Sequence, residues 1–253
     1  ALVLDSNTVH QIVQASEGSP LFVVEMARSA TWGADAENCV DPMRFSTHRS
    51  GNLPLPPKVQ AVIEFRLEQL SPLARELAGL AAVIGRSFTF NVLAQATDTD
   101  EDRLVQALDE LWQRRIIREQ RGDAYDFSHD RIRETTYVTI SPPRQWYLHR
   151  RVAQALEQIH AIDLDPVSAQ LGLHYEKVGV LDTAVSYYRR ASNVATAMNA
   201  LEQVIFYGKK VLLNLDCLPH SHANGECRID TLLQIASALR ALKGYCIVER
   251  KEL

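Results

Sequence analysis

The chain has 253 residues, a length that suits two domains, and its 46% hydrophobic and 23% charged residues are ordinary for a globular protein. A formal net charge of −4 gives no support for binding of the whole chain to nucleic acid or to an acidic membrane surface. The first ten residues do not predict a signal peptide, and no apolar run approaches the roughly 20 residues of a membrane span. Four irregularly spaced cysteines favour a reducing cytoplasm over a disulfide framework.

The first part of the chain predicts a helical lid segment followed by a linker. Apolar residues at helical spacing within 8–30 predict two helices, which the sequence EGSP interrupts. Pro20 suits the first turn of the second helix, where its missing N–H would be unsatisfied anyway. We assign residues 1–31 to the lid segment. Residues 32–56, with Gly, Pro, Ser and Asn throughout and no sustained period, predict the linker.

Residues 57–143 predict a winged-helix domain. Ser71 and Pro72 are expected to begin a helix that ends near Gly85, and a short helix follows at 88–98. The next helix, within 100–116, is expected to bury a stripe formed by Leu104, Leu108, Leu111 and Trp112.

A hairpin and a further helix complete this predicted domain. Two short alternating segments within 116–128 flank a turn at Gly122-Asp123, which predicts a hairpin. A helical pattern at 130–140 follows directly. Helices, then a hairpin, then a helix is the order of a winged-helix unit.

Residues 144–253 predict paired helices in an incomplete array that resembles tetratricopeptide repeats. In the clearest unit, 171–192, small residues let two helices approach and aromatic residues fill the gap; these are Tyr175, Gly179, Ala184, Tyr187 or Tyr188, and Ala191. Residues 195–215 suggest a second, degenerate unit and 228–245 half of a third. The predicted fold class is therefore mainly all-α, with one small β-hairpin.

Six segments in this order resemble one family, the bacterial signal-transducing ATPases with numerous domains (STAND), which are large ATPases related to the maltose-regulon activators. The segments are EGSPLFVVEMAR, LPPKVQAVIEFRLEQLS, AAVIGRSFTFNVLAQAT, YDFSHDRIRETTYVTI, RQWYLHRRVAQALE and LGLHYEKVGVLDTAVSYYRRA. The resemblance covers nearly the whole chain. It implies an ATP- or ADP-binding parent protein that uses Mg²⁺ and carries a cyclase, kinase or DNA-binding output domain.

The sequence departs from this family at the phosphate site. No G-x-x-x-x-G-K-[ST] motif occurs, so the chain lacks a phosphate-cradling loop and a magnesium-binding hydroxyl. The first residue is Ala1 rather than methionine, and we expect the catalytic core to precede it in a longer protein. We expect no ATP hydrolysis and no bound nucleotide or magnesium for this chain alone.

His129 and Asp130 are the first candidate site residues. The resemblance implies that Ser128, His129 and Asp130 match the family's Met-His-Asp stretch, with Ser128 replacing an apolar residue, and that His129 reaches the β-phosphate of bound ADP in the inactive state. A helix N-terminus attracts an anion, and an imidazole can donate a hydrogen bond to phosphate. Asp130 is expected to cap the helix. The alternative is that Asp130 is only a cap and His129 a packing residue.

Gly18 and Pro20 are the second candidate pair. The resemblance implies that the Gly-Ser-Pro turn brings Pro20 against the adenine ring, where a proline offers an apolar contact without a buried N–H. The alternative is a plain break between two helices.

Other chemistries find less support in the sequence. Four ligand-type residues lie within 217–227, but their spacing is not that of a closed zinc site, so we assign no metal; they are Cys217, His220, His222 and Cys227. No nucleophile elbow or carboxylate pair predicts a catalytic residue. The predicted recognition helix, 101–115, has four acids against three arginines, which disfavours nucleic-acid binding.

The function expected from these observations is that of a regulatory fragment of a nucleotide-switched ATPase in signal transduction, including transcription regulation. The winged helix would clamp the ADP state of the missing ATPase core. The repeats would sense a protein or small-molecule inducer, and release of the clamp would expose a surface for oligomerisation. The alternatives are an interaction scaffold with vestigial nucleotide motifs and, less favoured, a winged-helix DNA-binding regulator.

Overall fold

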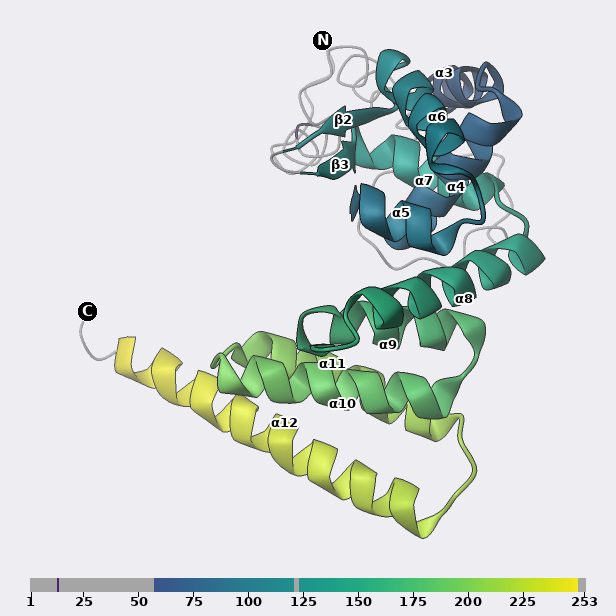
Figure 1. Ribbon diagram of the computed structural model, residues 1–253. Coiled ribbons are helices and arrows are strands. Elements are labelled where there is room, and N and C mark those ends of the chain that lie inside the picture. Colours follow the sequence, from purple (N-terminus) through teal and green to yellow (C-terminus); the bar gives the residue numbers. More distant parts are fainter. Residues whose placement is uncertain (1–12, 14–56, 121–122, 250–253) are drawn as a thin grey trace, which may run out of the picture.

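The computed structural model describes residues 13, 57–120 and 123–249, and helices dominate this part of the chain (Figure 1). The only β structure within it is one three-stranded antiparallel sheet. The predicted mainly α-helical fold with a small β element is therefore confirmed. The predicted lid segment and linker, residues 1–31 and 32–56, lie outside the described residues except for position 13.

The winged-helix unit occupies the upper half of Figure 1 and follows the predicted order of elements. Its elements are α3 (Pro57–Glu68), α4 (Pro72–Ile84), β1 (Ser87–Thr89), α5 (Phe90–Ala96), α6 (Glu101–Gln113), β2 (Ile117–Glu119), β3 (Ala124–Phe127) and α7 (Asp130–Thr139).

Helix α4 begins and ends where its sequence predicts. The Ser71 hydroxyl accepts a hydrogen bond from the backbone N–H of Ala74 at 3.2 Å, which satisfies one of the free donors of the first turn. Pro72 is the first helical residue, and the helix ends at Gly85, whose φ of 145° suits glycine. Between these signals the helix is almost entirely apolar, and it forms the centre of the core.

The sheet contains one strand more than the sequence predicts. Strands β2 and β3 form the predicted hairpin, with Ile117 opposite Phe127. Strand β1 pairs with the other edge of β3, with Ser87 opposite Asp126. Three residues are too few to show an alternating pattern. What holds β1 in place is Phe88, which is buried edge-on against the Phe127 ring with ring centroids 5.9 Å apart.

Trp112 is exposed, and its predicted place in the core is wrong. The residues that α6 buries are Leu104, Ala107, Leu108 and Leu111. They form a narrow stripe because α6 contacts the rest of the unit mainly through α4 and β2. Trp112 lies one position past this stripe, and 56% of its surface is exposed.

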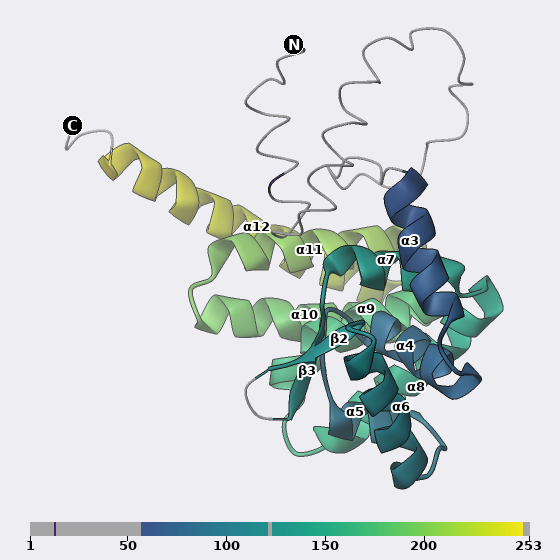
Figure 2. The same cartoon turned by 90° about the horizontal axis from the view of Figure 1, so that it is seen from above.

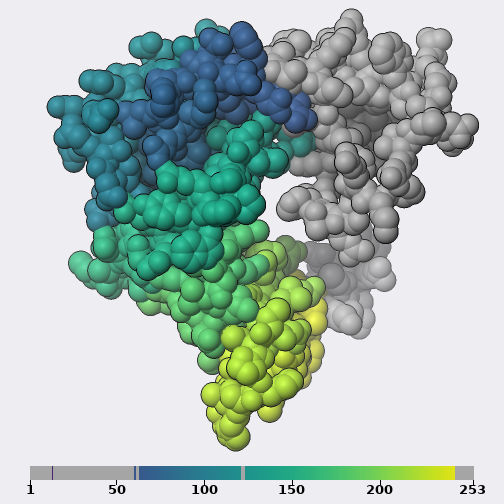
Figure 3. Space-filling view, turned by 90° about the vertical axis from the view of Figure 1, so that its right-hand side faces the viewer, coloured from purple at the N-terminus to yellow at the C-terminus, as the bar shows by residue number. Residues whose placement is uncertain are grey.

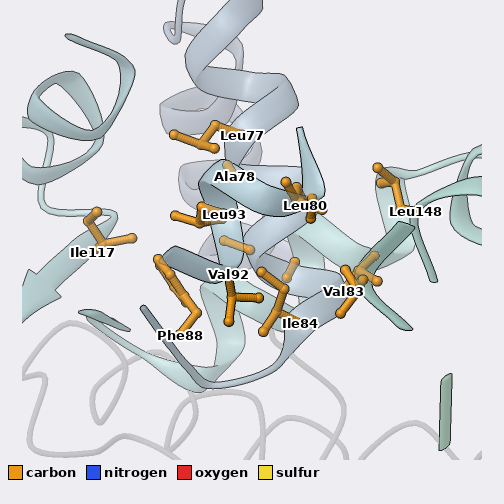
Figure 4. Close-up of a cluster of buried hydrophobic side chains, with 14 of the residues drawn as sticks. Leu77, Ala78, Leu80, Val83, Ile84, Phe88, Val92, Leu93, Ile117 and Leu148 are labelled. Atoms are coloured by element: carbon orange, nitrogen blue, oxygen red, sulfur yellow. The ribbon is translucent and has the colours of Figure 1, made fainter. Parts of the chain in front are cut away.

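One hydrophobic core joins the winged-helix unit to the first helices of the repeat region. Figure 4 shows part of it, with Leu80 and Val83 of α4, Leu93 of α5 and Leu148 of α8 (Pro142–Ile159) among the buried side chains of one cluster. The cluster continues through α8 to Leu171 of α9 (Ser168–Val178). The core thus crosses the boundary predicted between residues 143 and 144.

The repeat region tapers away from the winged-helix unit toward α12 (Figure 3). Its helices run side by side (Figure 2), each in contact with the next along the chain. After α8 they are α9, α10 (Leu181–Ala197), α11 (Leu201–Asp216) and α12 (His222–Glu249), and a short 3₁₀ turn, η3 (Asp165–Val167), precedes α9. The paired units are α9 with α10 and α11 with α12, so the predicted second unit at 195–215 is wrong in its boundaries.

The close approach within each pair depends on a glycine that the sequence analysis did not single out. A Cβ on Gly172 would lie 2.8 Å from the Tyr188 ring, and one on Gly208 would lie 2.7 Å from Ile235. Gly179, which we expected at the approach, instead ends α9 in the left-handed region at φ 82°.

Candidate functional site

His129 lies where strand β3 gives way to helix α7. It is the N-cap residue of α7, with extended backbone angles and a half-buried side chain, and its carbonyl accepts a hydrogen bond from the N–H of Ile132 at 3.0 Å. Its neighbour Ser128 is tied to the unit by a hydrogen bond from its N–H to the carbonyl of Ile116. The sequence therefore folds His129 onto the N-terminal end of a ten-residue helix, where anions are favoured.

Asp130 is not the cap that we expected. It is the first residue of α7, and its carboxylate accepts a hydrogen bond from Arg133 Nε at 2.9 Å within the same turn. Arg131 and Glu134 form a second pair at 2.9 Å. The charges of this first turn thus balance one another, and the helix begins without a side-chain capping bond from His129.

The other two predicted site residues, Gly18 and Pro20, lie outside the described residues. The structure therefore does not place them near His129 or away from it.

The structure reveals a buried polar chain that the sequence analysis missed. The Tyr137 hydroxyl of α7 is 3.0 Å from Nε2 of His149 on α8, and Nδ1 of His149 is 2.8 Å from Nδ1 of His174 on α9. Both histidines are almost fully buried, with 4% and 0% of their surface exposed. In the segments YLHRR and LGLHY, these histidines stand at positions where the helical pattern expects a buried apolar residue. This placement is the feature of the sequence that could have predicted their burial.

Both buried histidines are held neutral at pH 7. Burial lowers the pKa of His149 to about 4, with a smaller contribution from the charge of Lys177. Burial, followed by the neighbouring His149, lowers the pKa of His174 to about 3. A neutral imidazole has one donor and one acceptor nitrogen, so the chain carries single, directed hydrogen bonds rather than an ion pair.

Two carboxylates tie the repeat helices together. Glu157 of α8 accepts hydrogen bonds from the hydroxyls of Tyr175 and Tyr187, whose rings stack at 5.7 Å. Glu176 accepts from the Tyr188 hydroxyl and from Lys210 of α11. Burial alone would raise the pKa of Glu176, but these hydrogen bonds lower it below its usual value. Both networks are structural, because every polar group named bonds within the protein.

Two surface grooves flank α8. The larger, about 580 Å³, lies among α3, α4, α7 and α8, and its lining includes Glu64, Arg75, Glu76, Thr136 and Arg144. Glu76 and Arg144 form an ion pair, and Arg75 donates to the carbonyls at the end of α3, so these charges are used within the protein. The smaller groove, about 210 Å³, is lined partly by the Arg151–Asp98 pair.

The zinc-like residues do not converge. Cys227 is buried in a small cluster shared by α10, α11 and α12, whereas Cys217 is exposed at the end of α11. His222 is 90% exposed and lies 3.4 Å from Glu226. Over 57–120 and 123–249, no three His, Cys, Asp or Glu residues are grouped in a way that would hold a metal ion.

Helix α6, which occupies the recognition position of a winged helix, presents acids and apolar groups. Glu101, Asp102 and Asp109 are exposed on it. The exposed apolar residues are Val105 and Trp112. Arg103 is the exposed base of this helix, so exposed acids outnumber bases on it, and this charge balance disfavours contact with a phosphate backbone.

Comparison with known proteins gives a likeness of modest strength to one curated protein. No known protein family and no solved structure matches the sequence. Over 190 residues the chain is 30% identical to "Uncharacterized protein R02095" of Rhizobium meliloti (strain 1021). This stretch covers 74% of the chain but only 18% of that relative. In the part of the chain that the structure describes, no helix combines the length and apolar character needed to cross a membrane.

Proposed function

We propose that this chain is the regulatory part of a nucleotide-switched signal-transducing ATPase of the STAND class, in which the winged-helix unit clamps the ADP state and the repeats receive the signal. The observation that carries the proposal is His129, a half-buried imidazole at the N-terminus of α7. The length of the relative, of which the chain spans 18%, agrees with a multidomain parent protein.

The chemistry at His129 suits a phosphate clamp. The first turn of a helix directs backbone N–H groups toward its N-terminus, and the helix dipole places partial positive charge at the same end. In α7 the N–H of Ile132 is already bonded to the carbonyl of His129. A neutral imidazole there donates one hydrogen bond to a phosphate oxygen. Because Asp130 and Glu134 are already paired with arginines, neither acid presents an isolated negative charge to the ligand.

Helix α7 also offers a route from nucleotide to repeats. His129 lies at its first turn, and Tyr137, near its other end, bonds to His149 of α8. A shift of α7 on loss of the phosphate would therefore reach α8 and α9 directly. In the proposed switch, ADP holds α7 in place, and exchange for ATP or binding of an inducer releases it.

The ATPase core of the proposal belongs to the parent protein and not to this chain. We expect no phosphate release from ATP and magnesium by the isolated chain, because it has no phosphate-cradling loop. Turnover that survives repurification and exceeds a buffer blank would contradict this. The direct test of the clamp is the ADP affinity of the intact protein with and without the His129 imidazole.

A second candidate function, a protein-interaction scaffold, is favoured by an apolar stripe on α12. The stripe faces away from α11, since the α12 side chains that pack inward are Cys227, Thr231, Ile235 and Ala238. It repeats at helical spacing and consists of Ile229, Leu232, Leu233 and Leu239, each 43–63% exposed. An intact protein that binds neither ADP nor ATP would favour the scaffold over the switch.

A further inference from the structure

Three side chains on three consecutive helices link the winged-helix unit to the repeats. Tyr137 belongs to α7, His149 to α8 and His174 to α9, and Figure 1 shows α8 between the other two helices. Only residues 140 and 141 separate α7 from α8. That corner is fixed by Gln145, whose side-chain amide donates to the carbonyls of Tyr137 and Ile140 at 3.0 and 3.1 Å. The hydrogen-bonded chain continues from this corner into the repeats.

The distance between the two imidazoles constrains where their protons lie. A separation of 2.8 Å between the two Nδ1 atoms requires a proton on one of them and a lone pair on the other. Two neutral histidines must therefore hold different tautomers, one with Nδ1–H and the other with Nε2–H. The tautomer of His149 also decides whether its Nε2 accepts from the Tyr137 hydroxyl or donates to it. The state of one side chain thus sets the state of the next two.

The geometry points to a latch: we propose that Tyr137, His149 and His174 couple α7 to the first repeat. Movement of α7 relative to the first repeat would then break a buried hydrogen bond. The bonds are costly to break because the two histidines are shielded from water, which cannot replace a lost partner. Tyr137 and His174 are coupled only through His149. The latch does not depend on nucleotide binding at His129, and with such binding it would carry the signal.

A double-mutant cycle on the full chain tests the coupling. Tyr137→Phe removes one hydroxyl, and His174→Phe removes the other end of the chain while keeping a ring. If the two substitutions acted independently, their effects on the unfolding equilibrium constant would multiply. We expect the double variant to deviate from that product by about threefold or more, because without His174 the His149 tautomer is no longer fixed for Tyr137. The control is Tyr125→Phe, a half-buried tyrosine stacked on Phe88, whose effect should add to that of His174→Phe.

Amide exchange separates coupling from simple loss of stability. In Tyr137→Phe, the latch predicts faster exchange in α9, on the far side of α8, and no change in α12. Additive free energies with exchange changes confined to α7 would overturn the latch.

The wild-type chain provides a test that no folding failure can obscure. Nitrogen-15 spectra of the histidine side chains at pH 7 should show one of the two buried rings as the Nδ1–H tautomer and the other as the Nε2–H tautomer. Two Nε2–H tautomers, or a charged ring at this pH, would rule the proposal out.

Discussion

Two glycines determine how closely the repeat helices approach. Gly172 of α9 lies under the Tyr188 ring, and Gly208 of α11 lies under Ile235. In both places a side chain from the following helix occupies the space where a Cβ would be. In both pairs, a glycine on the first helix makes room for a side chain of the second helix. This shared feature indicates that the two pairs are versions of one packing unit.

Gly172→Ala should destabilise the chain by about 1–3 kcal/mol, because the new methyl group would overlap the Tyr188 ring, which is itself fully buried. Denaturant unfolding measures the change. Gly225→Ala is the matched control: it lies in α12 with open space around it, and removing a helical glycine should stabilise by about 0.5–1 kcal/mol. Equal effects of the two substitutions would contradict the packing role of Gly172.

The buried histidines make stability depend on pH. Their folded pKa values, about 4 and about 3, lie below the ordinary 6.5, so the unfolded chain takes up protons first as the pH falls. The free energy of unfolding is therefore unaffected by these groups above pH 6.5. It falls as the pH drops from about 6.5 to about 4 for His149 and to about 3 for His174, with a slope near 1.4 kcal/mol per pH unit for each histidine.

Urea unfolding at several pH values tests this dependence. His174→Phe should flatten the slope between pH 6.5 and 5, a window above the range in which carboxylates titrate. His222→Gln, at an exposed position, should leave the slope unchanged. A wild-type stability that stays constant from pH 7 to 5 would show that the two rings are not buried as described.

At the scale of single elements, helix α4 shows what the sequence can predict. Its limits follow from local chemistry. The Ser71 hydroxyl accepts a hydrogen bond from the backbone N–H three residues later, a proline occupies the first helical position, and a glycine ends the helix. The hairpin of β2 and β3 was predicted for the same reason, because alternation and a turn are both encoded locally.

Ser71→Ala should cost about 1 kcal/mol through loss of the capping bond to Ala74. Ser141 offers a matched comparison. It is the N-cap residue of α8, also precedes a proline, and makes no side-chain capping bond. Ser141→Ala should therefore cost clearly less in the same thermal or denaturant measurement, and an equal loss would mean that the Ser71 bond contributes nothing specific.

The features that the sequence did not predict are those that depend on distant contacts. Strand β1 exists because Phe88 meets Phe127, 39 positions further along the chain. The pairing of His149 with His174 requires α8 and α9 to fold back on each other, and nothing in the sequence around either histidine indicates the other as its partner. Asp130 was taken for a cap because acids are common there, yet its carboxylate pairs with Arg133 instead.

Near the candidate site, the sequence predicted a helix that begins at residue 130, and α7 begins there. His129 as a site residue stays a prediction. Its nucleotide role came from resemblance and stays a prediction. The coupling route from α7 to the repeats was visible only once three helices were placed in space.

Across the whole molecule, the hydrophobic core is continuous from the winged-helix unit into the first repeat helices and divides into small clusters toward α12. The largest hydrophobic cluster runs from α3 to α9, whereas two small clusters hold α10, α11 and α12. Among the described elements, α12 packs mainly on α11.

Hydrogen exchange should reveal this gradient. Amides of α8 should exchange only through global unfolding, and amides in the middle of α12 should exchange at least about tenfold faster through local opening, because fewer buried contacts hold that helix. Uniform protection from α8 to α12 would contradict the gradient.

The proposed function depends most on His129, which we propose clamps a nucleotide phosphate in the intact protein. Its most direct test is calorimetric titration of ADP into intact wild type and His129→Ala, with thermal melts to confirm that both are folded and His222→Ala as a surface control. Loss of one hydrogen bond to a charged group, about 1.5–3 kcal/mol, predicts a ten- to hundredfold weaker affinity for ADP. The same variant should show raised signalling output, because the closed state loses its clamp. Equal ADP affinity in folded wild type and His129→Ala would contradict the account and leave His129 as a packing residue.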